Sequence, residues 1–340
     1  MINQIKLSIC IATLNRAAFI GATLESIISQ ATEDVEIVIV DGASSDDTEQ
    51  VVGRYMHRFP RLRYFRQESN QGIDRDFNTA VESAHGKYCW LMSDDDLLKP
   101  GAIRSVLNEA IKNFGLIIVN AEVRNAALTE LIEDSRLHIS TNRIYSPLDG
   151  ERTFVDTASY LSFIGCVVIK RELWNSREKP KYFGTVFIHV GVIFQAPLLE
   201  DTLVIAEPLI MIRYGNALWT ARGFEIWMFK WPDLIWSFPD YSESAKRQVC
   251  LREPWRTWKE LLVYRAKGAF GIREYRIFLK SRLDSIWSRI PAFLIAITPG
   301  CLVNLLGMVY LSIFNTQSRL FIMEDLMKSR FNYRSCYRSR

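Results

Sequence analysis

The first 120 residues alternate between short apolar runs and longer amphipathic segments. The apolar runs are typical of buried strands, and they lie at 7–12, 35–41, 62–65, 88–92 and 116–120. Between them, apolar residues recur at helical spacing, as in the stretch 19–30. Strands that are separated by single helices form βαβ units, so we predict a parallel sheet with helices on both faces.

The pattern becomes less regular after residue 120. Residues 121–160 are polar and weakly periodic, which predicts a loop-rich insertion. A strand is expected at 163–170, followed by a helix that begins near Arg171. The apolar stretch 185–198 is compatible with either a helix or a strand. We therefore expect this part of the chain to extend the α/β domain with less regular elements.

The C-terminal third contains a long stretch without charge. We predict an α/β domain over 1–220 and a helical region over 221–340, in which residues 290–318 carry no charged side chain. Crossing a bilayer takes about 20 apolar residues, but two prolines and Gly300 interrupt this segment. It is therefore either a pair of buried helices or a helical hairpin that associates with a membrane.

Composition and charge exclude several classes of protein. A net charge of +4 is too small to indicate nucleic-acid binding. The six cysteines form no CxxC pair and the four histidines are not spaced as ligands. We therefore expect no zinc site and a reducing, cytoplasmic location. The apolar run at the N-terminus is short and leads directly into a strand pattern, so no signal peptide is expected.

Three consecutive aspartates, Asp94, Asp95 and Asp96, follow the strand predicted at 88–92. Ligands of open parallel sheets bind beyond the carboxyl ends of the strands. Crowded carboxylates repel one another unless positive charge lies among them, and Mg²⁺ or Mn²⁺ held together with substrate phosphates would supply that charge. The alternative is a polar turn in which one aspartate caps the next helix.

Other polar residues are predicted to lie at the same edge of the sheet. They are Thr13 and Asn15 after the first strand, Asp41 after the second, and Asn70, Gly72 and Arg75 around the start of the third helix. A carboxylate such as Asp41 can accept hydrogen bonds from a base or ribose, and Arg75 could contact a phosphate or a base. No GxGxxG or GxxxxGK[ST] motif follows a strand. A nucleotide held by carboxylates and a metal is therefore the remaining interpretation.

Four motifs in this half resemble, in order and spacing, those of family 2 glycosyltransferases with the GT-A fold. They are SICIATLNR, IVIVDGASSDDT, NQGIDRDFN and YCWLMSDDDLLKPGAI. The resemblance is close over residues 6–120 and looser to about residue 220. Within the family, the chain is most similar to bacterial enzymes of surface-polysaccharide assembly, including abequosyltransferase-like proteins. The resemblance implies a GT-A nucleotide-diphospho-sugar transferase fold, with a Rossmann-like, mostly parallel sheet and a helical C-terminal extension.

The resemblance also implies roles for individual residues. The donor-binding residues would be Thr13, Asn15, Arg16, Asp41, Asn70, Gly72, Arg75, Ser93, Asp94 and Arg213. Asp94 and Asp95 would match the last acid of the metal-binding Asp-x-Asp motif and the acid that follows it, with Mg²⁺ or Mn²⁺ as cofactor. Met92 stands where the family has the first aspartate of that motif. Arg213 belongs to 207–219, which resembles a later loop of the family that closes over the diphosphate.

The catalytic base is a second departure from the family. An acidic pair is common there, but none occurs around 185–195, and His189 falls near the expected position. Histidine can be a general base near neutral pH, although a lone histidine in an apolar run is more often a core residue. The candidate catalytic residues are therefore His189 and Asp95.

These expectations describe an inverting, metal-assisted glycosyltransferase that uses a nucleoside-diphosphate-sugar donor. A lipid-linked saccharide acceptor in surface-polysaccharide (O-antigen) synthesis would account for the apolar, basic C-terminal region. It would place the protein in peripheral contact with the cytoplasmic face of the inner membrane. Two alternatives are open: a sugar nucleotidyltransferase, and an inactive membrane-associated scaffold of the same fold. The absence of glycine from ATLNRAAF counts against the first, and Met92 with the missing acidic pair suggests the second.

Overall fold

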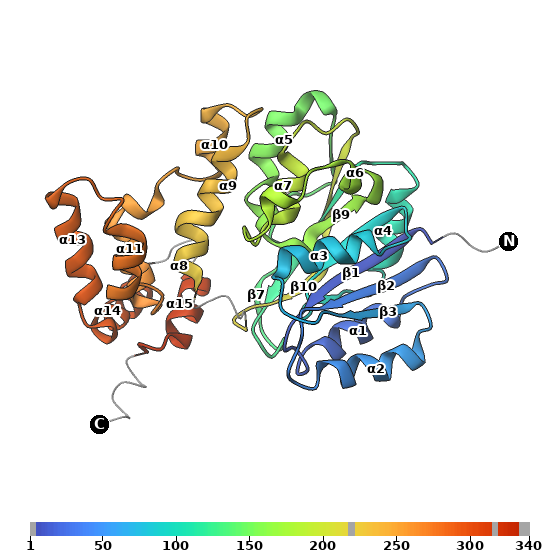
Figure 1. Cartoon of the computed structure of the whole chain (residues 1–340), viewed down its shortest axis with the longest axis horizontal. Coiled ribbons are helices and arrows are strands. Elements are labelled where there is room, and N and C mark those ends of the chain that lie inside the picture. The colour runs from blue at the N-terminus through green and yellow to red at the C-terminus, as the bar shows by residue number, and fades with distance from the viewer. Residues whose placement is uncertain (1–4, 217–221, 315–318, 333–340) are drawn as a thin grey trace. The chain divides into compact units, whose positions relative to one another are not determined.

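The computed structural model describes residues 5–216, 222–314 and 319–332, and the chain divides into two compact units (Figure 1). Unit 1 consists of Met1–Arg213 and Phe238–Val249. Unit 2 consists of Tyr214–Ser237 and Cys250–Arg340. Unit 1 therefore takes in most of the predicted α/β domain and adds a segment from beyond residue 220.

Within the described residues, unit 1 is built on a mixed ten-stranded sheet. The strands are β1 Leu7–Thr13, β2 Val35–Asp41, β3 Leu62–Arg66, β4 Tyr88–Met92, β5 Leu97–Leu98, β6 Leu116–Arg124, β7 Leu131–Glu133, β8 Arg143–Tyr145, β9 Val167–Lys170 and β10 Thr202–Arg213. The main path runs β3-β2-β1-β4-β9-β6-β10-β5, while β7 pairs with β6 and β8 with β10. All five strands predicted in the first 120 residues are present.

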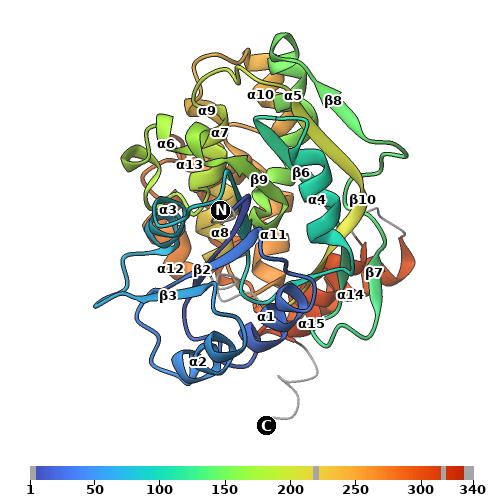
Figure 2. The ribbon, with the colours of Figure 1, turned by 90° about the vertical axis from the view of Figure 1, so that its right-hand side faces the viewer.

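The first four strands pair in parallel, as predicted. They are connected by α1 (Ile20–Ile28), α2 (Thr48–Arg58) and α3 (Ile73–Glu82). Helices α1 and α2 lie on one side of these strands and α3 lies on the other (Figures 1 and 2). Thr13 pairs with Asp41 where β1 and β2 end, and β4 flanks β1 on its other side. The polar residues after these strands therefore share one edge.

The second half of the sheet is mixed. Strand β9 is antiparallel to both β4 and β6, between which it lies, and β5 is antiparallel to β10. The resemblance predicted a loop over 207–219, and strand β10 corrects this for 207–213, because the strand continues alongside β6 through Arg213. Residues 217–219 of that stretch lie outside the described residues. Pro208 lies where the register between these strands shifts, and such an interruption hides a strand in the sequence.

Five further α-helices of the described residues complete unit 1. They are α4 (Ala102–Ala110), α5 (Gly150–Thr157), α6 (Arg171–Ser176), α7 (Ile188–Phe194) and α10 (Glu243–Val249). The helix expected to begin near Arg171 is α6, and the ambiguous stretch 185–198 contains α7. The region 121–160, predicted to be rich in loops, also holds β7, β8 and α5. The largest fully buried side chains include Trp90 and Trp174, which anchor the core of this unit.

Unit 2 is helical, as predicted for this region. Its α-helices are α8 (Gly223–Glu225), α9 (Trp231–Ser237), α11 (Trp258–Ala266), α12 (Ile272–Glu274), α13 (Ile286–Ile297), α14 (Gly300–Ile313) and α15 (Arg319–Lys328). Phe224, Phe270 and Leu279 are central members of its apolar core. In the part of the chain described, none of the helices alone has the length and apolar character of a membrane span. Helices α13 and α14 together have both, but they are bent by 92° at the predicted break.

Candidate active site

Asp41 is the last residue of β2 and is fully buried. Its Oδ1 accepts a hydrogen bond from the backbone N–H of Ser44 at 2.7 Å, and its Oδ2 accepts one from the hydroxyl of Tyr64 at 2.5 Å. Burial, reinforced by this hydrogen bond to Asp41, raises the pKa of Tyr64 well above its ordinary value. The hydroxyl therefore stays protonated and fixes the orientation of the carboxylate.

The loop after β1 is tied to the loop after β2. Asn15 adopts a positive φ of 55°, a conformation that asparagine tolerates better than most residues. Its backbone N–H donates to Ser44 Oγ at 2.8 Å, and its side-chain Oδ1 accepts from the backbone N–H of Ser45 at 2.7 Å. Thr13, beside Asp41 in the sheet, is buried. The structure thus brings Thr13, Asn15 and Asp41 together, as the sequence predicted.

Asp76 is a carboxyl group of this edge that the sequence analysis did not single out. It lies in the first turn of α3 and is only 4% exposed. A Cβ atom on Gly42 would lie 2.8 Å from its Oδ2, so a larger residue in the loop after β2 would displace the Asp76 carboxylate. Among the described residues, its Oδ1 has no hydrogen-bond partner. A buried oxygen without a partner is costly, which makes Asp76 a candidate contact for a polar ligand beside Asp41.

The charge of Asp76 predicts a dependence of stability on pH. Burial, together with the charges of Asp41 and Asp74, raises its pKa to about 6. Because the folded-state pKa is above the unfolded value, this group favours folding most at acidic pH. That stability is lost as the pH rises through about 4 to 6.

We therefore expect Asp76→Asn to increase the free energy of unfolding at pH 7.5 by up to about 3 kcal/mol, at about 1.4 kcal/mol per pKa unit. At pH 4 the effect should be small. Urea unfolding at both pH values measures this difference. Asp74→Asn is the matched comparison in the same helical turn, and it should lower stability at pH 7.5. A gain that is equal at pH 4 and pH 7.5 would show that charge is not the cause.

Asp74 holds a segment that precedes α7. Its carboxylate accepts hydrogen bonds from the backbone N–H groups of Gly184 at 2.8 Å, Val186 at 2.9 Å and Ile188 at 3.1 Å. Val186 has a positive φ of 67°, which is strained for a β-branched residue. Asp74 therefore stabilises an unusual backbone conformation, a role that depends on residues more than 100 positions away.

Three of the predicted donor-binding residues lie before and in α3. Asn70 and Gly72 form a turn, and Arg75 stacks on an aromatic ring. Asn70 Oδ1 accepts from the backbone N–H of Gly72 at 2.8 Å, and Gly72 has a φ of 90°, which favours glycine. The guanidinium of Arg75 lies 4.4 Å from the centre of the Phe183 ring. This contact orients Arg75 by a cation–π interaction and does not consume its hydrogen-bond donors.

Arg16 joins the loop after β1 to the aspartates after β4. Its Nε donates to Asp94 Oδ1 at 3.0 Å and its Nη2 pairs with Asp95 Oδ2, although 78 positions separate Arg16 from Asp94. All three side chains are largely buried. Burial raises the pKa of Asp94 to about 6; the charge of Asp95 adds to the rise and that of Arg16 opposes it. Positive charge is thus strongly favoured at this position.

The oxygen atoms at the end of β4 suit a hard divalent cation. Mg²⁺ commonly binds through one or two carboxylates together with substrate phosphates and water, and Asp94 and Asp95 offer that set. Over 5–216, 222–314 and 319–332, no three His, Cys, Asp or Glu side chains are grouped to hold a metal ion. Two carboxylates therefore fit a cation that the donor phosphates help to hold, and Arg16 would share the carboxylates with it.

Asp96 organises the end of β10. Its Oδ2 accepts from Ser93 Oγ, and its Oδ1 accepts from the backbone N–H of Arg213 at 2.7 Å. The side chain of Arg213 donates from Nε to the Asp95 carbonyl at 3.0 Å and from Nη1 to the Ala126 carbonyl at 2.6 Å. Asp96 therefore caps no helix. Arg213, the last residue of β10, lies beside Asp95 and Asp96, and we call the edge of the sheet that carries Asp94, Asp95 and Asp96 the acidic edge.

His189 occupies a different environment from the one expected of a catalytic base. It lies in α7, is 1% exposed, and its Nε2 is 2.7 Å from the Leu161 carbonyl oxygen. Burial lowers its pKa to about 4. A neutral imidazole without access to solvent does not support the predicted role as general base. The structure instead gives His189 the place of a core residue.

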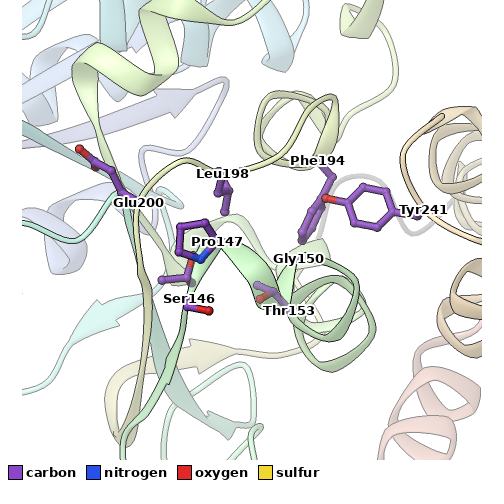
Figure 3. Close-up of a pocket in the computed structure, with 9 residues that line it drawn as sticks. Ser146, Pro147, Gly150, Thr153, Phe194, Leu198, Glu200 and Tyr241 are labelled. Atoms are coloured by element: carbon purple, nitrogen blue, oxygen red, sulfur yellow. The ribbon is translucent and has the colours of Figure 1, made fainter.

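Figure 3 shows a pocket of unit 1 that is lined by other residues than those of the acidic edge. Its lining residues include Ser146, Thr153, Phe194, Glu200 and Tyr241. Its volume is about 10 Å³, room for about one water molecule. None of the residues predicted to bind the donor lines it. It is therefore too small for a sugar or a nucleotide.

The arrangement at the acidic edge can be compared with known proteins. Residues 8–171, which contain β1 to β4 and the aspartates after them, match the model of glycosyl transferase family 2. The chain carries a family 2 glycosyltransferase domain. The predicted family and enzyme class are thereby confirmed.

Several bacterial glycosyltransferases are similar in sequence to this family 2 domain. The chain is 28% identical over 235 residues to abequosyltransferase RfbV of Salmonella typhimurium, covering 64% of this chain and 69% of that protein. It is 32% identical over 116 residues to GalNAc(5)-diNAcBac-PP-undecaprenol beta-1,3-glucosyltransferase of Campylobacter jejuni, covering 34% and 38%. It is 35% identical over 118 residues to chondroitin synthase of Escherichia coli, covering 35% and only 17%.

Solved structures confirm the fold of this chain. S. aureus TarS 1–349, crystallised in complex with UDP, superposes with a TM-score of 0.55 at 15% identity. The superposition covers 98% of this chain and 92% of that chain. A second crystal structure of TarS 1–349 contains UDP-GlcNAc. The predicted GT-A architecture, with a mostly parallel sheet and a helical C-terminal region, is confirmed.

Proposed function

We propose that this glycosyltransferase transfers a sugar from a nucleoside-diphosphate-sugar to a hydroxyl of a growing saccharide in surface-polysaccharide synthesis. The observation that supports this most is the convergence of Asp41, Arg16 and Asp94 at one edge of the sheet. The edge lies at the carboxyl ends of parallel strands, where nucleotides bind in this class of fold. Relatives that are named as an abequosyltransferase, a glucosyltransferase acting on an undecaprenol-linked saccharide and a chondroitin synthase support the same class of substrate.

The donor would be bound by the residues that the strands position. Asp41 is oriented by Tyr64 and Ser44, so its carboxylate can accept hydrogen bonds from a base or ribose, with Asp76 beside it. Arg213 and Arg16 carry the positive charge that the diphosphate needs. Thr13, Asn15, Asn70, Gly72, Arg75 and Ser93 complete the proposed donor site.

A divalent cation fits this proposal. Asp94 and Asp95 would hold Mg²⁺ or Mn²⁺, which when bound would offset the charge that develops on the departing diphosphate. Asp95, the other predicted catalytic residue, pairs with Arg16 and would contact the cation on the diphosphate side, so we propose it as a cation ligand and not as the base that removes the proton of the acceptor hydroxyl. Attack from the face opposite the diphosphate would invert the anomeric carbon.

A lipid-linked acceptor is the second part of the proposal. The name of the Campylobacter relative includes an undecaprenol-linked saccharide, and unit 2 exposes large apolar side chains such as Trp287 and Leu306. We propose that the acceptor saccharide is attached to a lipid diphosphate and that the protein works at the cytoplasmic face of a membrane.

The proposal can be tested by following the products of the reaction. Purified protein with Mn²⁺ is screened against UDP-, CDP-, GDP- and dTDP-sugars with a lipid-linked saccharide, and release of nucleoside diphosphate is measured. The expected result is release of the nucleoside diphosphate together with transfer of the sugar to the acceptor. Release of pyrophosphate from a sugar phosphate and a nucleoside triphosphate would show a nucleotidyltransferase. No binding of any nucleoside diphosphate would show a scaffold.

Asp41→Asn should weaken donor binding about 10- to 100-fold, because a hydrogen bond to a charged group contributes about 1.5–3 kcal/mol. Thermal stabilisation by the nucleoside diphosphate measures this loss, since a bound ligand raises apparent stability by mass action. Asp47→Asn, at an exposed aspartate just before α2, is the control and should bind normally. Equal affinity of the two variants would remove Asp41 from the site.

A further inference from the structure

Helices α13 and α14 of unit 2 expose most of their large apolar side chains, and apart from Leu311 the residues that they bury are small or polar. In α13 the buried residues are Ala292 and Ala296, whereas Trp287 is 81% exposed. Further exposed apolar residues are Ile286, Ile290, Phe293, Leu294 and Ile297. A helix that faces water shows the opposite arrangement, with its large apolar residues inside. Small residues at the interface between helices and large apolar ones outside are typical of helices in lipid.

The same pattern continues in α14. Its buried residues include Gly300 and Asn304, and Asn304 donates from Nδ2 to the carbonyls of Ala266 and Leu326 at 3.2 and 2.9 Å. The exposed apolar residues of this helix are Leu302, Leu305, Leu306, Val309, Tyr310 and Ile313. Each helix therefore exposes an apolar side, and we call the two sides together the α13–α14 face.

The α13–α14 face adjoins a basic pocket. A pocket of about 340 Å³ is lined by Arg265, Arg273 and Arg330, with Ile297 of the face and one acid, Glu274. Arg265 is structural, because its Nε and Nη2 donate to the carbonyl of Thr298 between α13 and α14. Arg273 and Arg330 are exposed and supply the charge.

Further exposed basic residues follow the pocket along the chain. Arg276 and Lys280 lie three and seven residues after Arg273, in and just after the continuous helical stretch 272–279. Positive charge beside an apolar face is complementary to lipids with anionic phosphate headgroups, and each such residue near the surface contributes about 1 kcal/mol.

We propose that the α13–α14 face docks onto an anionic lipid bilayer, with the arginine-lined pocket at the level of the lipid phosphates. Helices of this length span about 18 and 21 Å, less than the ~30 Å hydrocarbon core, and they are bent by 92°. The pair therefore lies in the interface. Trp287 and Tyr310 are the residue types that favour the boundary between lipid and water. The inference deepens the proposed function, since it names the surface that would bring the enzyme to a lipid-linked acceptor.

Vesicle binding by the full chain tests the proposal. The protein is sedimented with vesicles of phosphatidylcholine alone and with vesicles containing 30% phosphatidylglycerol. We expect stronger binding to the second kind, and an at least tenfold loss of binding for Trp287→Glu or Leu306→Glu, because burying a large apolar side chain is worth about 1.5–3 kcal/mol. Arg273→Glu should reduce the preference for phosphatidylglycerol about fivefold or more and leave the weaker binding to phosphatidylcholine unchanged.

Leu148→Glu is the matched control. Leu148 belongs to unit 1 and is 97% exposed, so the same chemical change should leave vesicle binding intact. Equal loss in Leu148→Glu and Trp287→Glu, or no binding of the wild type to either vesicle, would overturn the proposal. Light scattering without vesicles that shows a dimer broken by Trp287→Glu would overturn it too, because a second copy would then cover the face.

Failure of docking and failure of the proposed function are distinguishable. Stabilisation by nucleoside diphosphates, measured without vesicles, depends on unit 1 and should be unchanged in Trp287→Glu and Leu306→Glu. Normal nucleotide binding without vesicle binding would overturn the docking surface alone. Vesicle binding without nucleotide binding would overturn the proposed function alone.

Discussion

Replacing Asp94 with asparagine is expected to reduce sugar transfer by about 10²- to 10³-fold, the usual cost of removing one group that stabilises charge in a transition state. The substitution keeps the shape of the side chain and removes its charge. Asp95 still pairs with Arg16, so the fold should be retained. Release of nucleoside diphosphate under saturating donor measures the effect, and the thermal unfolding midpoint reports on the fold.

The control for this experiment is Asp240→Asn. Asp240 belongs to unit 1 and is exposed, so the same change should leave turnover within about twofold of the wild type. Turnover near the wild-type level in Asp94→Asn would show that Asp94 is not part of the reaction. A large fall in the unfolding midpoint would attribute the loss of activity to folding instead.

Replacing Arg16 with methionine is expected to lower the free energy of unfolding by about 3–5 kcal/mol, because it leaves buried carboxylates without their partner. The side chains of Arg16, Asp94 and Asp95 are 7–13% exposed. Arg16 opposes the rise in the pKa of Asp94, so its loss should push this pKa further upward. Denaturant unfolding in the presence of EDTA measures the loss of stability.

Addition of Mn²⁺ makes the test of Arg16 more specific. If Asp94 and Asp95 bind a cation, millimolar Mn²⁺ should restore part of the stability of Arg16→Met and have a smaller effect on the wild type. Arg58→Met is the matched control, because Arg58 pairs with Glu25 at 2.7 Å on the exposed surface, where ion pairs contribute little. No difference between the two variants would show that the buried ion pair is not important for folding.

The architecture of the first 120 residues follows from local sequence patterns. Apolar runs of strand length, separated by amphipathic segments, predicted β1 to β4 and the helices between them. The parallel pairing of β1 with β2 then places Thr13 beside Asp41. The break at Pro299 and Gly300 was also visible in the sequence, because proline and glycine interrupt helices through their own backbone properties. These features depend on residues that are near in sequence.

The arrangement of charges at the acidic edge was decided by the tertiary structure. The pairing of Arg16 with Asp94, the open oxygen of Asp76 beside Gly42, and the burial of His189 all involve residues brought together from distant parts of the chain. Sequence periodicity shows which residues are buried in one element, but not which side chains of other elements face them. The strand β10 was missed because Pro208 interrupts its pattern and because its partner β6 lies far earlier in the chain, with Thr202 paired to Leu116.

For α13 and α14 as well, the sequence predicted the elements and the tertiary structure decided which side chains are exposed. The sequence determined that residues 290–318 are apolar and interrupted, and it left buried helices and a membrane hairpin as equal alternatives. Only packing decided that Ala292, Ala296 and Asn304 turn inward while Trp287 turns outward. A helix that is apolar on all sides can bury any of them, because the hydrophobic effect is not directional. Contacts with the neighbouring helices of unit 2 therefore determine which side is buried.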